Sequence, residues 1–350
     1  QWSPIVNRGK LRWPDDSRVA LCVVVNLEHM EWTHPEGSFT TLLAGGMGSR
    51  GTPDFARTSH REYGHRVGIF RVLDTLERHG IKATVAMDAI TAQNYPYLVD
   101  HCKKRGCEII GHGTSVSRMI SSRMTEQEER DYIRSSMDSL HRATGKAPTG
   151  WLSPEYGEST RTPQLLSEAG IRYVCDWVND EQPYKLESPH GDIFALPMML
   201  ELDDVVSLWQ RRVTVGRYRD MITEGFDTLY QDGIQTGRLM TLKTGLLRIS
   251  GQSQLLPRAH LAENLPEPYL RGPVLIDKAL LRFLESIARC GQIIDNVDKG
   301  LQGLRSFVDL APQAGPQPIL FTLSGPGVVP GTSRVSQSSC LTKFLQNHPS

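Results

Sequence analysis

Buried strands and amphipathic helices alternate along most of the chain. Residues 18–27, which read RVALCVVVNL, form a continuous β-branched apolar run with charged flanks, as expected of a strand buried on both faces. Residues 66–80 instead repeat apolar side chains at helical spacing and end at a glycine, which predicts a helix packed on the sheet. Further strands are predicted at 81–87, 107–112, 149–154, 171–177, 192–200 and 237–242, and helices at 94–106, 125–145, 162–170 and 215–233.

The connections between these elements are short, which predicts parallel strands joined by right-handed crossovers. About seven strands in one run predict an α/β fold, a distorted (β/α) barrel, in a single domain over residues 12–300. Residues 244–267 show neither a strand nor a helix period, so we expect an insertion in that domain. Residues 301–350 are rich in serine, glycine, proline and glutamine, which predicts a poorly ordered tail.

The composition excludes several classes of partner. The chain carries 39 basic and 39 acidic side chains, so it has no overall basic field to attract nucleic acid or a membrane surface. Every apolar run is shorter than the roughly 20 residues that a membrane-spanning helix needs. The six cysteines are scattered, as expected for buried thiols of an intracellular protein. We therefore expect a cytoplasmic protein that binds neither nucleic acid nor membrane, and the composition leaves a homo-oligomer open.

Polar side chains gather where the predicted strands end. In a barrel of this kind the chemistry lies at the carboxyl ends of the strands. The side chains found there are those of Asn26, Glu28, His29, Asp88, His112, Glu155, Asp176, Trp177, Asp180 and Lys243. Loops are polar in general, but so large a set at one end of the barrel predicts a functional site there.

Six short motifs stand in order along the first two thirds of the chain. They are VVVNLEH (23–29), REYGHRVG (61–68), GIKATVAM (80–87), GCEIIGHG (106–113), GKAPTGWLSPE (145–155) and YVCDWVNDEQP (173–183). With these motifs the chain resembles the NodB-homology polysaccharide deacetylases, carbohydrate esterase family 4. The resemblance is closest to the branch that holds peptidoglycan-deacetylase-like proteins and metal-independent allantoinases of PuuE type. It implies a distorted (β/α) barrel and hydrolysis of a carbon–nitrogen bond outside peptides.

The resemblance also implies where a metal would bind. Metal-dependent members use an aspartate on the first strand and two histidines four residues apart on the third. The corresponding residues here are Asn26, His112 and Val116, of which only the histidine is a metal ligand. The allantoinase branch carries the same asparagine and then a glutamate, the position of Glu28. We expect no cofactor; the alternative is zinc held by Glu28, His29 and His112, although adjacent side chains point to opposite faces of a strand.

Glu28 and His112 are the predicted catalytic residues. Amide hydrolysis needs a base for water, a donor for the oxyanion and a proton for the leaving nitrogen. Glu28 follows a buried strand, and partial burial is expected to raise its pKa toward the working range of a base. His112 is expected to titrate near neutral pH and to orient the substrate carbonyl or protonate the leaving group. Its alternative is a structural histidine bonded to a neighbouring loop.

Further side chains are predicted to contact the substrate, namely those of Asn26, Arg61, Glu155, Glu158, Trp177 and Asp180. The three acids would accept hydrogen bonds from amide or ureide N–H groups, or else cap loops. Trp177 would form a wall of the pocket or pack in the core. Arg61 would hold a substrate carboxylate or pin the long loop before it through a salt bridge.

Without a metal, the acetamide of a sugar is a hard substrate, whereas a strained or activated ring is easier. We therefore predict a hydrolase of a small cyclic amide, ureide or imide, with residues 37–55 as a lid. The alternatives are a metal-dependent polysaccharide N-deacetylase and a binding protein that keeps only the barrel. The binding protein is supported by one missing feature. Related sequences carry a His-Pro pair after the strand matched by 237–242, and this chain does not. Here Lys243 follows that strand instead. It would be either a cation that stabilises the oxyanion or a solvated lysine without a role.

Overall fold

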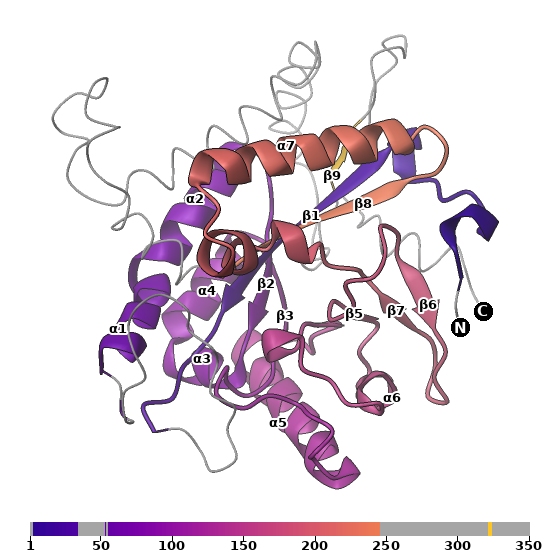
Figure 1. Ribbon diagram of the computed structural model, residues 1–350. Coiled ribbons are helices and arrows are strands. Elements are labelled where there is room, and N and C mark those ends of the chain that lie inside the picture. The colour runs from indigo at the N-terminus through magenta and orange to yellow at the C-terminus, as the bar shows by residue number, and fades with distance from the viewer. Residues whose placement is uncertain (1–2, 34–52, 54, 246–320, 324–350) are drawn as a thin grey trace, which may run out of the picture.

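The strands form one curled sheet, and helices ring its outer side (Figure 1). The computed structural model describes residues 3–33, 53, 55–245 and 321–323 of the chain. In these residues the strand order is β6-β7-β5-β4-β3-β2-β1-β8, with β9 paired to β1. The strands are β1 (Val19–Leu27), β2 (Thr84–Met87), β3 (Glu108–Gly111), β4 (Gly150–Trp151), β5 (Tyr173–Val174), β6 (Tyr184–Leu186), β7 (Ile193–Ala195), β8 (Arg238–Thr244) and β9 (Phe321–Leu323).

The helices lie between these strands in the chain. They are α1 (Phe55–Tyr63), α2 (Ile69–Arg78), α3 (Ala89–Asn94), α4 (Pro96–Lys104), α5 (Glu126–Thr144), α6 (Thr162–Glu168) and α7 (Val215–Asp232). Shorter 3₁₀ or π turns are η1 (Ile5–Asn7), η2 (Pro14–Asp16), η3 (Gly64–Gly68), η4 (Pro154–Tyr156), η5 (Leu200–Leu202) and η6 (Val205–Gln210). No helix in the described part of the chain combines the length and apolar content needed to span a membrane.

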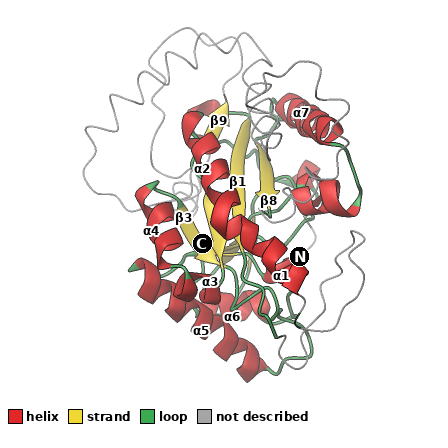
Figure 2. Ribbon diagram, turned by 90° about the vertical axis from the view of Figure 1, so that its left-hand side faces the viewer, coloured by secondary structure: helices red, strands yellow, loops and turns green. Residues whose placement is uncertain are grey.

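β1 is the longest of the described strands, and all nine of its side chains are buried. It pairs in parallel with β2 on one side and with β8 on the other. Its odd-numbered side chains, Val19 to Leu27, pack with those of α2, α4 and α7 in the outer core. Ala20, Cys22 and Val24 pack inside the curl. Figure 2 shows α2 lying across the strands. The predicted strand buried on both faces is therefore confirmed.

The predicted α/β fold with a curled (β/α) sheet is confirmed, with two additions that the sequence pattern did not indicate. β6 runs antiparallel to β7 at one end of the sheet, and β9 runs antiparallel to β1. The three residues of β6 are half-buried or exposed, so they lack the apolar run that marks the other strands.

The helical segment before β2 begins earlier than predicted. It starts with α1 at Phe55, passes through the π turn η3 and continues as α2, whereas the sequence predicted a start at residue 66. The segment FARTSHREY is mostly polar, so it shows no apolar stripe in the sequence. As a consequence Arg61 lies inside a helix, not in the loop before it.

β8 runs two residues beyond the predicted strand, to the first residue of the predicted insertion. The strand reaches Thr244, and the Thr244 hydroxyl and Gly245 N–H both donate to the buried carboxylate of Asp204. Thr244 therefore belongs to the sheet, and Gly245 directly follows it. The rest of the predicted insertion (246–267), most of the predicted lid (37–52 and 54) and all of the predicted tail except β9 lie outside the described residues. The domain boundaries remain predictions.

A carboxyl group lies inside the curl, far from the carboxyl ends of the strands. Glu108 is the first residue of β3 and shares an inward face with Ile110. It is 6% exposed, and the Thr84 hydroxyl donates to it at 3.4 Å. Burial raises the pKa of Glu108 to about 8, although hydrogen bonds with Tyr173, Thr84 and Thr149 oppose the shift.

This raised pKa predicts a stability change with pH. Between pH 4.5 and about 8, folded Glu108 keeps a proton that the unfolded chain loses, so the free energy of unfolding falls as pH rises. The Glu108→Gln side chain stays neutral. In urea unfolding, the free energy of unfolding of this variant should therefore rise relative to the wild type by up to about 1.4 kcal/mol per pH unit in this range. Exposed Glu187→Gln is the control. Parallel stability curves for wild type and Glu108→Gln would contradict the assignment.

Candidate active site

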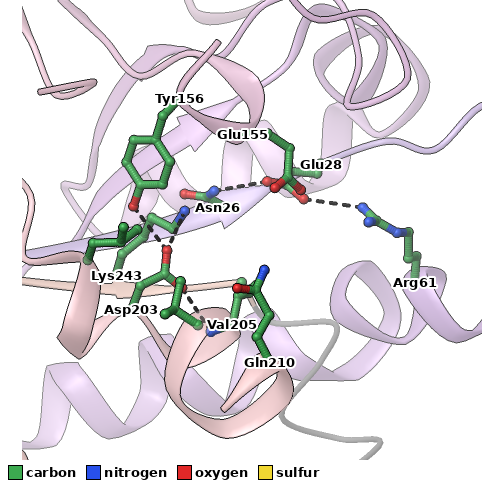
Figure 3. A pocket seen from close by; sticks show the side chains of 12 residues that line it. Asn26, Glu28, Arg61, Glu155, Tyr156, Asp203, Val205, Gln210 and Lys243 are labelled. Carbon is green, nitrogen blue, oxygen red and sulfur yellow. Dashed lines mark hydrogen bonds and ion pairs between the residues drawn. The ribbon is translucent and has the colours of Figure 1, made fainter. Parts of the chain in front are cut away.

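A cavity of about 160 Å³ opens at the carboxyl ends of β1 and β8 (Figure 3). It is lined by Asn26, Glu28, Arg61, Glu155, Tyr156, Leu200, Asp203, Val205, Val206, Gln210, Lys243 and Gly245. The first two residues come from the end of β1, Arg61 comes from α1, and the remainder come from η4, from η5 with η6, and from the end of β8. The site therefore lies where the barrel was predicted to hold its chemistry.

Strand register explains why three of these side chains meet. Lys243 of β8 is paired with Val24 of β1, and paired residues in a parallel sheet point to the same face. Asn26 and Glu28 follow Val24 at intervals of two, so they continue that inward-facing row. An amide, a carboxylate and an ammonium group thus line one wall of the cavity.

Glu28 is the acceptor at the centre of this wall. Its Oε1 accepts hydrogen bonds from Asn26 Nδ2 at 2.9 Å and from His112 Nε2 at 3.1 Å. Among the described residues, its Oε2 receives one longer contact, from Arg61 Nη1 at 3.4 Å. One oxygen is therefore held by two donors, while the other is available to a ligand in the cavity (Figure 3).

The expectation of a raised pKa for Glu28 is wrong. Burial by itself would raise the pKa, but the hydrogen bond from His112 and the positive charges of His112, Arg61 and Lys243 outweigh it. The pKa of Glu28 therefore lies well below its usual range, and the side chain is a carboxylate throughout the neutral range.

His112 lies behind Glu28, is 0% exposed and is not among the residues that line the cavity. Its Nδ1 is 2.5 Å from the carbonyl oxygen of Leu152, which can only accept a hydrogen bond. Its Nε2 faces the carboxylate of Glu28, which also only accepts. Both ring nitrogens therefore carry hydrogen, and the ring is an imidazolium. Burial would lower the pKa of His112, but the bond to Glu28 and its charge outweigh this and raise it.

This geometry corrects the predicted role of His112. The side chain reaches the cavity only through Glu28, so it neither orients a substrate carbonyl nor protonates a leaving group directly. In the structure it holds the carboxylate of Glu28 in place and balances its negative charge.

The residues at the metal positions of related enzymes do not fit a zinc ion. Both nitrogens of His112 donate to oxygen atoms, and the amide nitrogen of Asn26 donates to Glu28. Val116 is fully buried and offers no ligand atom. The alternative ligand His29 is not among the residues that line the cavity, and its ring lies 6.2 Å from that of Tyr95. Within the described ranges no three His, Cys, Asp or Glu side chains are placed to share an ion.

A second ion pair joins the wall formed by β1 and β8 to the opposite one. The sequence pattern did not indicate Asp203, and it placed Tyr156 after a predicted strand without assigning it a role. Lys243 Nζ is 2.7 Å from Asp203 Oδ2, and the Tyr156 hydroxyl donates to the same oxygen at 3.0 Å. Asp203 Oδ1 accepts the Val205 N–H at 2.8 Å. Lys243 is 8% exposed, so it is not a solvated lysine. Burial would lower its pKa, but Asp203 outweighs this and raises it. The inward spacing of Leu239, Thr241 and Lys243 was the available signal in the sequence.

Of the predicted substrate contacts, Asn26, Arg61 and Glu155 line the cavity, whereas Glu158, Trp177 and Asp180 do not. Asp180 forms an ion pair with Arg8 and accepts two backbone N–H groups of its own loop. Glu158 lies beside Asp176, and burial with that neighbouring charge raises its pKa to about 9. Trp177 packs against the core cluster around α5 and α6.

The protonation of His112 can be observed directly. We expect both of its nitrogens to carry hydrogen at pH 7 in nitrogen-15 NMR spectra, with a titration midpoint above 6.5, because Glu28 stabilises the cation. The His112→Gln variant identifies the signals. The stability from this pair is complete below pH 6.5 and is lost as pH rises through the raised pKa, so the variant should approach the wild type at alkaline pH. A neutral His112 ring at pH 6 would contradict the ion pair.

Comparison with known proteins agrees with the resemblance seen in the motifs. Residues 62–174 match the family model described as "Polysaccharide deacetylase". A Schizosaccharomyces pombe protein assigned to the polysaccharide deacetylases is 25% identical over 255 residues, 66% of this chain and 79% of that protein. Peptidoglycan deacetylase of Helicobacter pylori is 30% identical over 183 residues, which are 51% of this chain and 60% of that enzyme.

Solved structures share the fold. A PuuE allantoinase superposes with a TM-score of 0.66 at 23% identity, covering 82% of this chain and 89% of that one. A Pseudomonas aeruginosa protein assigned to the polysaccharide deacetylases superposes with a TM-score of 0.65 at 22% identity, covering 80% and 88% of the two chains. These findings confirm the predicted resemblance to the polysaccharide deacetylases and the fold class.

Proposed function

We propose that the chain hydrolyses the carbon–nitrogen bond of a small cyclic amide, ureide or imide, without a metal ion and with Glu28 as the general base. The match of residues 62–174 to the polysaccharide deacetylase model supports hydrolysis of such a bond. One observation carries the proposal. Glu28 is an ionised carboxylate with Oε1 locked by Asn26 and His112 and with Oε2 available at the wall of the cavity.

The size of the cavity supports a small ring as substrate. Its volume of about 160 Å³ lies below the roughly 300–1,000 Å³ of common ligand pockets. A groove for a polymer would need room for several sugar units in a row. An allantoinase is among the solved proteins that share this fold, so a small substrate is compatible with the architecture.

The proposed reaction uses water as its second substrate. A water molecule next to Glu28 Oε2 attacks the carbonyl carbon, a C–O bond forms, and the water proton passes to the carboxylate. The tetrahedral intermediate then collapses, the C–N bond breaks, and the proton on Glu28 passes to the leaving nitrogen. Glu28 ends as a carboxylate, and His112 remains an imidazolium that holds it in place.

Two alternatives come from different observations. A metal-dependent polysaccharide N-deacetylase would match the names of the relatives, but Asn26, His112 and Val116 do not offer a set of metal ligands. A binding protein without activity would match the absence of the His-Pro pair after β8. A screen of small cyclic amides and ureides beside N-acetylated sugar oligomers distinguishes all three, because each hypothesis predicts a different substrate or none.

The metal-free proposal predicts little bound zinc. Protein purified without added metal should hold far less than one equivalent in elemental analysis, because the nitrogens of His112 are occupied by Glu28 and Leu152. Treatment with a chelator should leave the hydrolysis rate unchanged. Stoichiometric zinc that disappears in His112→Ala would overturn the metal-free proposal.

Glu28→Gln tests the base. The variant keeps the size of the side chain but cannot accept the water proton, so kcat should fall by about 10²–10⁴-fold while substrate still binds. The matched control is Glu31→Gln, since Glu31 lies on the same loop but is held by Arg118 and Ser115 outside the cavity.

The pH profile gives a second reading of the same group. Since the pKa of Glu28 is below its usual range, the wild-type rate should show no loss from protonation of this base between pH 8 and 5. An unchanged kcat in Glu28→Gln, or an acid limb near pH 6–7 that this variant abolishes, would contradict the assignment.

A further inference from the structure

Hydrolysis by Glu28 leaves one requirement unmet, a positive group for the oxyanion. Arg61 and Lys243 are the cations that line the cavity. Arg61 contacts Glu28 Oε2, the oxygen assigned to the water, so it serves the base. Lys243 lies on the neighbouring strand β8 and is paired with the other wall through Asp203.

The ammonium group of Lys243 is held from two sides. Asp203 Oδ2 lies 2.7 Å from Nζ, and the ring of Tyr156 lies beneath Nζ with its centroid 4.2 Å away. Asp203 is itself fixed by the Tyr156 hydroxyl and by the N–H of Val205. An ammonium group has three N–H donors, and among the described residues Asp203 and the Tyr156 ring are its two contacts, which together occupy at most two of the three. Such a fixed donor needs no rearrangement when charge develops on a substrate.

The side-chain oxygen of Asn26 lies near Lys243 and could accept the N–H of an amide group. Asn26 is 4% exposed, and its Oδ1 is a buried oxygen that accepts no hydrogen bond from any described residue. In Figure 3 the Asn26 amide lies between Glu28 and the Lys243 ammonium group. A donor next to an unsatisfied acceptor matches the C=O and N–H of an amide or ureide group.

We propose that Lys243 is a further catalytic residue, whose ammonium group donates a hydrogen bond to the substrate carbonyl oxygen and stabilises the oxyanion. This inference rests on the proposed function, since it assigns the electrophile for the base Glu28. When water forms the C–O bond, the carbonyl electron pair moves to oxygen, which is neutralised by Lys243. When the C–N bond breaks, that pair re-forms C=O. Lys243 keeps its proton throughout, so it acts as a cation and not as a nucleophile.

Lys243→Met keeps much of the apolar stem and removes the charge. We expect kcat to fall by about 10²–10³-fold, as for the loss of one oxyanion donor, with little change in KM. A charged tetrahedral phosphonate analogue of the substrate should bind more weakly by a similar factor, while neutral substrate should bind as before. Lys185→Met is the control, because Lys185 pairs with Asp192 at the surface of β6.

The single variant leaves Asp203 buried without its cation and risks misfolding, so a double variant is needed. Lys243→Met with Asp203→Asn removes both charges and should fold, but it should stay as slow as Lys243→Met. If the double variant regains the wild-type rate, Lys243 serves only to neutralise Asp203 and the inference is overturned while the proposed function stands. Absence of wild-type activity on every cyclic amide and ureide would overturn the proposed function and this inference together.

Discussion

The ion pair between Glu28 and His112 is the interaction on which the rest of the site depends. His112 has no exposed surface, and its Nδ1–H is committed to the Leu152 carbonyl oxygen. A buried cation without an anion costs several kcal/mol, so the imidazolium requires the carboxylate at Nε2. This bond decides which oxygen of Glu28 is locked, and Asn26 reinforces the choice. The remaining oxygen faces the cavity for that reason.

The same pair changes what the site can do. Asn26 and His112 stand at positions that bind a metal ion in the metal-dependent members of the family that the motifs resemble. Here both bind the carboxylate of Glu28 instead. Under the proposed function this carboxylate is the base, and because a carboxylate cannot polarise a carbonyl group, that task needs a cation. The sheet register places Lys243 on the adjacent strand, where Asp203 balances its charge. Two ion pairs thus stand at the cavity, Glu28 with His112 and Lys243 with Asp203.

The wall opposite the strands is built at a local cost. Glu155 and Tyr156 have φ values of 52° and 58°, in the left-handed region that residues with side chains seldom adopt. This conformation carries the Tyr156 hydroxyl to Asp203 and places Glu155 at the cavity. Strained backbone is maintained where surrounding contacts over-determine it, and functional sites are where such strain gathers.

Sequence by itself determined the alternation of strands and helices and the shared face of Asn26 and Glu28, because side-chain periodicity is a local property of the backbone. Lys243 joined that row only through the register of β8 against β1. Only the tertiary structure decided the low pKa of Glu28, since its partner His112 is 84 residues away. It also moved Glu158, Trp177 and Asp180 out of the cavity and brought Asp203 and Tyr156 in. Charge interactions act through space between distant segments, and no periodic pattern records those distances.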